Sequence, residues 1–356
     1  MPVYLDTQAM PPPVRTNAPW TSDMPRFDPD EHSNACLHIG LVNNMPLAAM
    51  KATESQFLSL LHAASDDVCL HVSLYTLPGV RTLCTGTDEL DCYTRLDTLW
   101  ERSLDGLIVT GAEPMTLHLA DEPYWPSLTR LAAWATERTY AAVWSCLAAH
   151  AVVLMQDGIA RVRSSTKHFG IFQCAQTGAH PLLNDIPSTF AVPHSRWNGL
   201  NEEELSAAGY NVLSRIEHGG VDAFVKQFRS LFVFLQGHPE YSTDTLLREY
   251  RRDMTRYVRG ESDTTPRLPL HYFDPATEAL LSDLCSEGRM PCNDRSLAEL
   301  SSILLTARIA DNWHASAGSF YRNWLQQIRL EKTRHLRASG FSPMEGSTLH
   351  GTASSA

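Results

Sequence analysis

Alternation of short apolar runs with helix-forming stretches limits what this chain can fold into more than any other feature of its sequence. The apolar runs are 37–42, 68–77, 104–110, 140–144 and 231–236. The helical stretches that follow them are 53–64, 125–138, 147–155 and 243–257. Strands that alternate with helices in this way form a mostly parallel sheet with helices on both faces. We therefore expect an α/β fold with a mostly parallel sheet flanked by helices.

Both ends of the chain differ from this middle part. Residues 1–35 are rich in proline and polar residues and show no apolar period, and residues 339–356 have the same character. We expect both segments to be disordered or loosely attached tails. Residues 36–260 then form the α/β domain. Residues 261–338 include two amphipathic patterns, at 296–309 and 320–330, and are expected to be a helical extension that packs on the domain.

Charge and hydropathy exclude two classes of partner. The 29 basic and 40 acidic residues give a net charge of −11, whereas a nucleic-acid binder needs a dominant basic face. The longest apolar stretch, 140–155, is shorter than the ~20 residues of a membrane helix, and polar side chains interrupt it. We expect neither a nucleic acid nor a membrane as a partner.

The cysteines and histidines show no metal-binding spacing. None of the eight cysteines belongs to a C-x-x-C pair, and no secretory signal is recognisable at the N-terminus. We therefore expect reduced cysteines, a cytoplasmic protein and no metal. Neither the dinucleotide fingerprint nor the P-loop motif is present, so no permanently bound cofactor is expected.

A cysteine stands where an apolar run meets a helical stretch. Cys146 follows the run 140–144 and precedes the small-residue stretch that begins at Leu147. This is the geometry of a nucleophile elbow, in which the helix N-terminus favours a thiolate and the N–H of Leu147 points towards an oxyanion. A buried structural cysteine is the alternative at this position, since free cysteine is among the most buried residue types.

A histidine and a glutamate follow the last apolar run. His238 and Glu240 flank Pro239, directly after the strand predicted at 231–236. In extended backbone, residues two apart point to the same side, so both side chains can face one site. A histidine oriented by a carboxylate and placed beside a cysteine is what thiolate catalysis requires. A surface turn with two unrelated polar residues is the alternative.

Several stretches together resemble the homoserine O-acyltransferase family, whose fold is like that of class I glutamine amidotransferases. The resemblance covers 37–260 closely and about 310–328 loosely. The stretches that carry it are Asn44-Met45-Pro46, Thr53-Glu54-Ser55-Gln56-Phe57, Asp105 to Ala112, Tyr124-Trp125-Pro126, Cys146 with Gly158-Ile159, Pro193-His194-Ser195-Arg196, Gly237-His238-Pro239-Glu240-Tyr241, Arg252-Asp253 and Asn323-Trp324-Leu325.

The resemblance implies an O-acyltransferase of methionine biosynthesis that forms an O-acyl-L-homoserine by a ping-pong mechanism. Cys146 would become an acyl-thioester, His238 would be the general base and Glu240 its orienting partner. The residues implied to contact substrate are Lys167, Ser195 and Arg252. The arginine fork suits a carboxylate. The co-substrate would be an acyl-CoA, and a homodimer stays open.

The acyl donor depends on the loop after Gly111-Ala112. In the family, a glycine at one position of this loop is associated with succinyl transfer and a glutamate with acetyl transfer. Met115 stands at that position and is uncharged, so it does not repel a succinyl carboxylate. We expect succinyl-CoA as the donor, and acetyl-CoA is the alternative if Glu113 faces Cys146.

Three other functions stay open. L-Serine is the closest competing acceptor, because one methylene is usually discriminated by only about 1–3 kcal/mol. A glutaminase or related hydrolase would use the same triad on an amide, although 140–148 lacks the flanking glycines expected there. A non-catalytic binding protein on this fold is the third, and the joint presence of the triad with Lys167, Ser195 and Arg252 argues against it.

Overall fold

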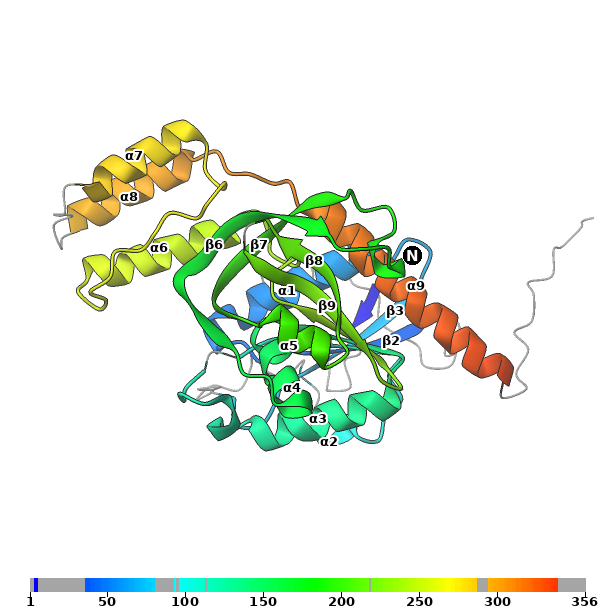
Figure 1. Cartoon of the computed structure of the whole chain (residues 1–356). Helices are drawn as coiled ribbons and strands as arrows, with labels where there is room; N and C mark the ends of the chain where they lie inside the picture. The colour runs from blue at the N-terminus through cyan, green and yellow to red at the C-terminus, as the bar shows by residue number, and fades with distance from the viewer. Residues whose placement is uncertain are drawn as a thin grey trace, which may run out of the picture.

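The structure, a computed structural model, describes residues 3–5, 36–80, 93, 96–112, 114–217, 219–286 and 294–338. Its centre is a ten-stranded sheet with the strand order β1-β3-β2-β4-β5-β10-β9-β8-β6-β7. Figure 1 shows the parallel half of this sheet behind an antiparallel half formed by β6 to β9.

Six neighbouring strands are parallel and confirm the predicted α/β class. They are β1 (Val3–Leu5), β3 (Leu70–Tyr75), β2 (Leu37–Val42), β4 (Gly106–Val109), β5 (Ala141–Ser145) and β10 (Leu231–Leu235). Apart from the edge strand β1 and one residue of β2, every residue in these strands is buried. Burial on both faces explains why the apolar runs are almost continuous.

The antiparallel half was not predicted from the sequence. It consists of β9 (Gly220–Gln227), β8 (Asn211–Ile216), β6 (Val162–Gln176) and β7 (Thr189–Gly199), with η2 (Pro181–Leu183) and α5 (Glu202–Ala207) in the connections. Much of β6 is exposed or half-buried, and its pairing with β7 shifts register between Arg163 and His168. A half-exposed strand with a bulge lacks the continuous apolar run that marks a buried strand.

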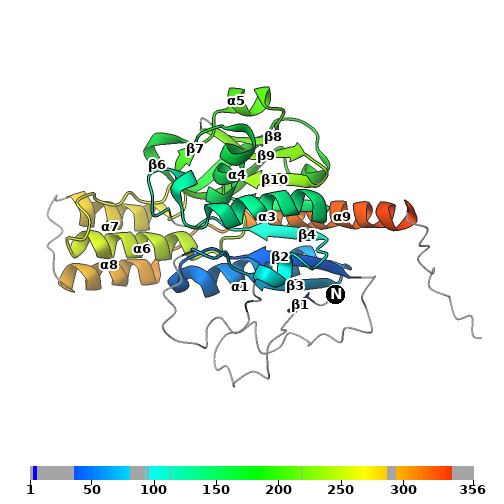
Figure 2. The same ribbon diagram turned by 90° about the horizontal axis from the view of Figure 1, so that it is seen from below.

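Helices cover both faces of the sheet, as predicted. α3 (Trp125–Arg138) and α4 (Leu147–Asp157) pack on one face, whereas α1 (Leu47–Ala64) and α9 (His314–Ala338) pack on the other (Figure 2). Two short helices, α2 (Leu96–Leu99) and η1 (Leu119–Asp121), lie on the same face as α3 and α4. The buried residues of α3 follow the helical period, at Leu128, Leu131, Ala132 and Ala135.

Three further helices project from the sheet side by side (Figures 1 and 2). They are α6 (Thr245–Val258), α7 (Pro275–Ser286) and α8 (Asp294–Thr306), and they share a core with β6 residues Phe169 and Ile171. α8 and α9 lie on the two amphipathic patterns of the sequence, whereas α7 was not predicted. The predicted tail 339–356 lies outside the described residues.

The start of the chain departs from the prediction of a loose tail. Val3–Leu5 form β1, which pairs with β3 in parallel, and Val3 is buried. An apolar segment of three residues is too short to show a period, but an open sheet edge can still take it up. The prediction is wrong for these three residues, and 6–35 lie outside the described part.

A disulfide joins Cys36 to Cys69, so the prediction of reduced cysteines is wrong for this pair. Both cysteines directly precede neighbouring parallel strands, in which Leu37 is paired with Leu70. This register places the two Cα atoms 4.6 Å apart, within the range that a disulfide spans. Among the described helices, none has the length and apolar character needed to cross a bilayer.

Candidate active site

Cys146 occupies the turn between β5 and α4, as the sequence predicts. Its φ of 50° is unusual for a residue other than glycine, and its N–H donates to Leu235 O at 2.7 Å. Strained backbone of this kind is typical of functional turns, because only the surrounding fold can maintain it. The turn leaves Cys146 partly exposed at the N-terminus of α4.

The loop after β4 lies directly against this turn. A Cβ atom on Gly111 would lie 2.8 Å from Leu147 Cβ and 3.0 Å from Leu147 N. Only glycine therefore allows the loop to approach so closely. The Leu147 N–H is in the first turn of α4, where the helix dipole favours negative charge. The geometry suits an oxyanion site at Leu147.

His238 and Glu240 lie together after β10. His238 Nδ1 is 2.8 Å from Glu240 Oε1, and both side chains are largely buried. β10 is the parallel neighbour of β5, so His238 and Cys146 follow the same end of adjacent strands. Burial disfavours the charged imidazole, but Glu240 and a hydrogen bond with Cys146 outweigh it and raise the pKa of His238 well above its usual value.

Tyr241 links this pair to helix α6. Its ring stacks on His238, with centroids 4.4 Å apart and planes 15° apart. Its hydroxyl donates to Glu249 Oε1 at 2.7 Å. The sequence alone predicted no role for Tyr241 or Glu249. Tyr241 is the last residue of the Gly237–Tyr241 motif, and Glu249 stands three residues before Arg252 on α6.

Two carboxylates of α6, Glu249 and Asp253, contact the residues that were expected to bind substrate. Ser195 Oγ donates to Glu249 Oε2 at 2.5 Å, and Lys167 Nζ lies 3.8 Å from the same oxygen. Lys167 also lies 3.6 Å from Asp253 Oδ2, and Arg252 Nε donates to Asp253 Oδ1 at 2.8 Å. Lys167, Ser195 and Arg252 therefore meet at one face of α6, connected to the histidine through Tyr241.

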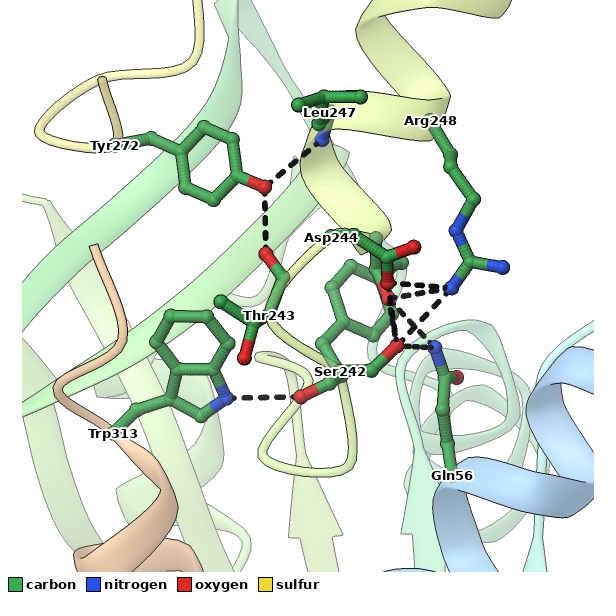
Figure 3. Close-up of polar contacts among 10 residues, drawn as sticks. Gln56, Ser242, Thr243, Asp244, Leu247, Arg248, Tyr272 and Trp313 are labelled. Carbon is green, nitrogen blue, oxygen red and sulfur yellow. Dashed lines mark hydrogen bonds and ion pairs between the residues drawn. The ribbon is translucent and has the colours of Figure 1, made fainter. Parts of the chain in front are cut away.

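The turn between Tyr241 and α6 is fixed from three directions (Figure 3). Gln56 of α1 donates to Ser242 Oγ at 3.3 Å, and Trp313 Nε1 donates to Tyr241 O at 3.1 Å. Tyr272 OH donates to Thr243 O at 2.6 Å. Segments far apart in sequence thus hold the turn, and with it the segment of His238 and Glu240, in one position.

The loop expected to select the acyl donor is held by a buried carboxylate. Glu122 Oε1 accepts from the N–H groups of Met115 and Thr116, at 2.7 and 2.8 Å. Glu122 is 2% exposed, whereas Met115 is 43% exposed. Glu113 lies outside the described residues.

In the described part of the chain, two groups of side chains bring potential metal-ligating atoms close together. In Cys36, Cys69 and His71 the two thiols are joined in the disulfide. In the second group, Cys174, His194 and Asp222, burial and Asp222 raise the pKa of Cys174, which disfavours a thiolate. His194 Nδ1 accepts from Arg196 Nε, so the neutral ring carries its proton on Nε2, towards Asp222. Neither group offers a complete donor set.

Comparison with known sequences finds one family over most of the chain. The model of the family described as "Homoserine O-succinyltransferase" matches residues 23–334. A protein of that name from Rhodopseudomonas palustris is 41% identical over 318 residues, which are 89% of this chain and 96% of the relative. Another from Methylorubrum extorquens is 42% identical over 293 residues, covering 82% of this chain and 87% of the relative.

Solved structures with a similar arrangement include a glutamine amidotransferase from Methylobacillus flagellatus. It is 16% identical, and the match covers 83% of this chain and 96% of that chain with a TM-score of 0.46. A glutamine amidotransferase from Thermotoga maritima is 12% identical, and the match covers 83% and 99% of the two chains with a TM-score of 0.44.

Proposed function

Because this chain belongs to the homoserine O-succinyltransferase family, and is therefore an acyltransferase, we propose that it transfers a succinyl group from succinyl-CoA to L-homoserine through Cys146. The reaction is a ping-pong exchange, and its product is the O-acyl ester used in methionine synthesis. One observation carries the proposal: the Cys146 turn and the His238–Glu240 pair follow the same end of two adjacent parallel strands. Within the pair, His238 Nδ1 lies 2.8 Å from Glu240 Oε1.

In the first half-reaction the Cys146 thiolate attacks the carbonyl carbon of the acyl-CoA thioester. The oxyanion that forms lies at the Leu147 N–H, and it collapses with loss of the CoA sulfur. The departing thiolate takes a proton from His238, so the products are free CoA and the Cys146 acyl-thioester. The raised pKa of His238 supports this order, because the histidine starts the reaction protonated.

In the second half-reaction His238 acts as the base. Negative charge on Cys146 is one cause of the raised pKa of His238, and acylation removes that charge. The pKa of His238 therefore falls once the thioester has formed. His238 then takes the proton of the homoserine hydroxyl, the oxygen attacks the thioester, and Cys146 leaves as a thiolate that restores the starting state.

The acceptor is held at the face of α6. Arg252 binds its α-carboxylate through the guanidinium fork, and Lys167 and Ser195 complete the polar contacts. Glu249 accepts from Ser195 and Tyr241, so its carboxylate is placed to receive the α-ammonium group of the same amino acid.

Two features support succinyl-CoA over acetyl-CoA as the donor. The uncharged Met115 stands at the position where a glutamate would repel the succinyl carboxylate. The relatives from Rhodopseudomonas palustris and Methylorubrum extorquens carry the name homoserine O-succinyltransferase. We also infer a cytoplasmic location, where acyl-CoA and homoserine are both available.

Intact-mass spectrometry tests the proposal directly. The protein is mixed with succinyl-CoA or, separately, acetyl-CoA, with no acceptor present. We expect a succinyl adduct that maps to Cys146, is absent from Cys146→Ala and disappears when L-homoserine is added. An acetyl adduct alone would reverse the donor, and an adduct on another cysteine would overturn the nucleophile. Faster loss of the adduct with L-serine than with L-homoserine would reverse the acceptor.

A further inference from the structure

A buried cation on β7 contacts the histidine that packs against Gly237, and the proposed reaction gives this cation no role. Arg196 of β7 is 6% exposed. Its Nε donates to His194 Nδ1 at 3.2 Å, and its Nη1 donates to Asn198 O at 2.6 Å. The preceding residue of the strand, Ser195, points to Glu249 on α6. Because side chains alternate along a strand, Arg196 faces the opposite side, towards the interior.

Asp222 of β9 supplies the opposite charge through His194. His194 Nε2 lies 3.2 Å from Asp222 Oδ1, and Ser214 Oγ donates to Asp222 Oδ2 at 2.7 Å. Burial lowers the pKa of His194 to about 4, so its ring is neutral. The ring accepts from Arg196 on one nitrogen and turns its proton towards Asp222 on the other. A neutral imidazole thus joins a buried cation to a buried carboxylate, an arrangement we call the Arg196–His194–Asp222 relay.

This relay adjoins the backbone that carries His238. A Cβ atom on Gly237 would lie 2.8 Å from His194 Nε2 and 2.9 Å from Asp222 Oδ1. Gln236 N donates to Asp222 O at 2.9 Å, and His238 N donates to Pro193 O at 2.8 Å. Residues of the relay, or their direct neighbours, therefore fix each of the three residues from 236 to 238.

Gln236 connects the guanidinium to the strand end that holds the Cys146 turn. A Cβ atom on Gly199 would be 3.0 Å from Arg196 Nη1 and 3.9 Å from Gln236 Oε1, so the two side chains share one space. Gln236 follows Leu235, whose carbonyl accepts from Cys146 N. Burial lowers the pKa of Arg196, and negative charge on Cys146 opposes this lowering. The charges of Arg196 and Cys146 are therefore close enough to interact.

We propose that Arg196 is a positioning residue of the active site, held by His194 and Asp222, and that it keeps a positive charge beside Cys146 while the relay fixes the backbone of His238. The proposal rests on Cys146 being the nucleophile. It adds an electrostatic contribution that the Cys146–His238–Glu240 triad does not contain.

The test measures how the alkylation of Cys146 by iodoacetamide depends on pH, without substrates and with the site located by peptide mapping. Cys146 interacts electrostatically with His238, Arg196 and Tyr241, and the carboxylates Glu240 and Glu249 act on His238 and Tyr241 in turn. The variants are Arg196→Met, Arg196→Lys and Asp222→Asn. The matched control is Arg215→Met, since Arg215 lies in the same antiparallel half of the sheet, on β8, but is half-exposed and paired with Glu202.

Two variants should move the profile in opposite directions. Arg196→Met should raise the pH of half-maximal alkylation by about one unit, which is a tenfold slower reaction at low pH. Asp222→Asn should lower that pH, because it removes a negative charge and keeps the cation. Arg215→Met should match the parent. A folded Arg196→Met with the parental profile would overturn the proposal, as would shifts of the same sign in both variants.

Arg196→Lys distinguishes the effect of the positive charge from the effect of the hydrogen bonds that hold it. It also tests the proposal if Arg196→Met does not fold. Lysine keeps the charge but cannot donate to His194 and Asn198 with a planar fork. We expect a profile close to the parent and a kcat at least about tenfold lower, with KM little changed. A parental kcat would overturn the positioning role. If the parent forms no acyl adduct, the proposed function fails instead, while the alkylation profile still reports on Arg196.

Discussion

The ring of Tyr241 lies flat against the imidazole of His238, with their centroids 4.4 Å apart, and the Tyr241 hydroxyl donates to Glu249. One side chain thus contacts the proposed base and the proposed acceptor site. Burial, followed by the nearby carboxylates Glu249 and Glu240, raises the pKa of this phenol well above its usual value. It therefore stays protonated and acts as a fixed donor.

Tyr241→Phe should separate the two functions of this residue. The ring still stacks on His238, but Glu249 loses one of its donors, so its carboxylate is held less firmly. We expect KM for L-homoserine to rise about three- to tenfold, or about 0.7–1.4 kcal/mol, with kcat within about twofold of the parent. This is less than the about 1.5–3 kcal/mol of a hydrogen bond to a charged group, because the lost bond acts on the substrate only through Glu249. Steady-state kinetics check this. A fall in kcat with KM unchanged would contradict it, and Tyr241→Leu, which removes the stacked ring, should lower kcat.

Glu240→Gln should lower the pKa of His238. The Glu240 carboxylate raises that pKa, and a neutral amide of the same shape cannot. NMR titration of the His238 ring should show a midpoint below that of the parent, and turnover should fall.

The rate losses of His238→Ala and Glu240→Ala should not multiply. We expect the double variant to turn over little more slowly than the slower single variant, because the two residues act as a unit. An unchanged midpoint, or losses that multiply, would argue against the pair.

The Cys36–Cys69 bond should stabilise the fold without affecting catalysis. It precedes the amino ends of β2 and β3, whereas Cys146 follows the carboxyl end of β5 in the same parallel sheet. The bond spans 33 residues. A loop of this size contributes roughly 3–4 kcal/mol in the chain-entropy account. In a Cys36→Ser/Cys69→Ser double variant, the free energy of unfolding measured in urea should fall by about that amount, with kcat unchanged. A large loss of kcat in the folded variant would contradict this.

Stability should fall as the solution becomes mildly acidic, partly because of His150. Burial lowers its pKa in the fold to about 4, while an unfolded histidine titrates near 6.5. The unfolded state therefore binds more protons between these values. The stability that the neutral ring contributes is complete above pH 6.5 and is lost as the pH falls towards 4. The loss attributable to His150 is roughly 1 kcal/mol at pH 5.5.

Urea unfolding at pH 7.5 and 5.5 checks the contribution of His150. His150→Gln keeps an amide donor for Gln236 and does not titrate, so the difference between the two pH values should shrink by about 1 kcal/mol. His194 has the same direction of shift and should still contribute to the remaining difference. A His150→Gln protein with the parental pH dependence would rule out this source.

Local patterns predicted five of the six parallel strands, all but β1. The strand at 37–42 and the helix at 125–138 have the predicted bounds, because each buries one continuous apolar surface that a short stretch of sequence records. The Cys146 turn and the His238–Glu240 pair are equally local, since each depends on residues next to the end of one strand.

The residues that sequence reasoning missed depend on contacts between distant segments. Glu249 matters because Ser195 and Tyr241 both donate to it, and nothing in the sequence around α6 records those partners. The antiparallel strands were missed because their exposed residues break the apolar period.

The sequence by itself determined the α/β class, the strand-to-helix turn at Cys146 and the pairing of His238 with Glu240, because these follow from periodicity and from residues close together in the chain. Only the tertiary structure decided which charges surround them. It placed Arg196 against His194, Tyr241 against Glu249, and Cys36 beside Cys69. The physical reason is that pairing between strands fixes these contacts, and the register of distant strands is a property of the whole sheet rather than of any one segment.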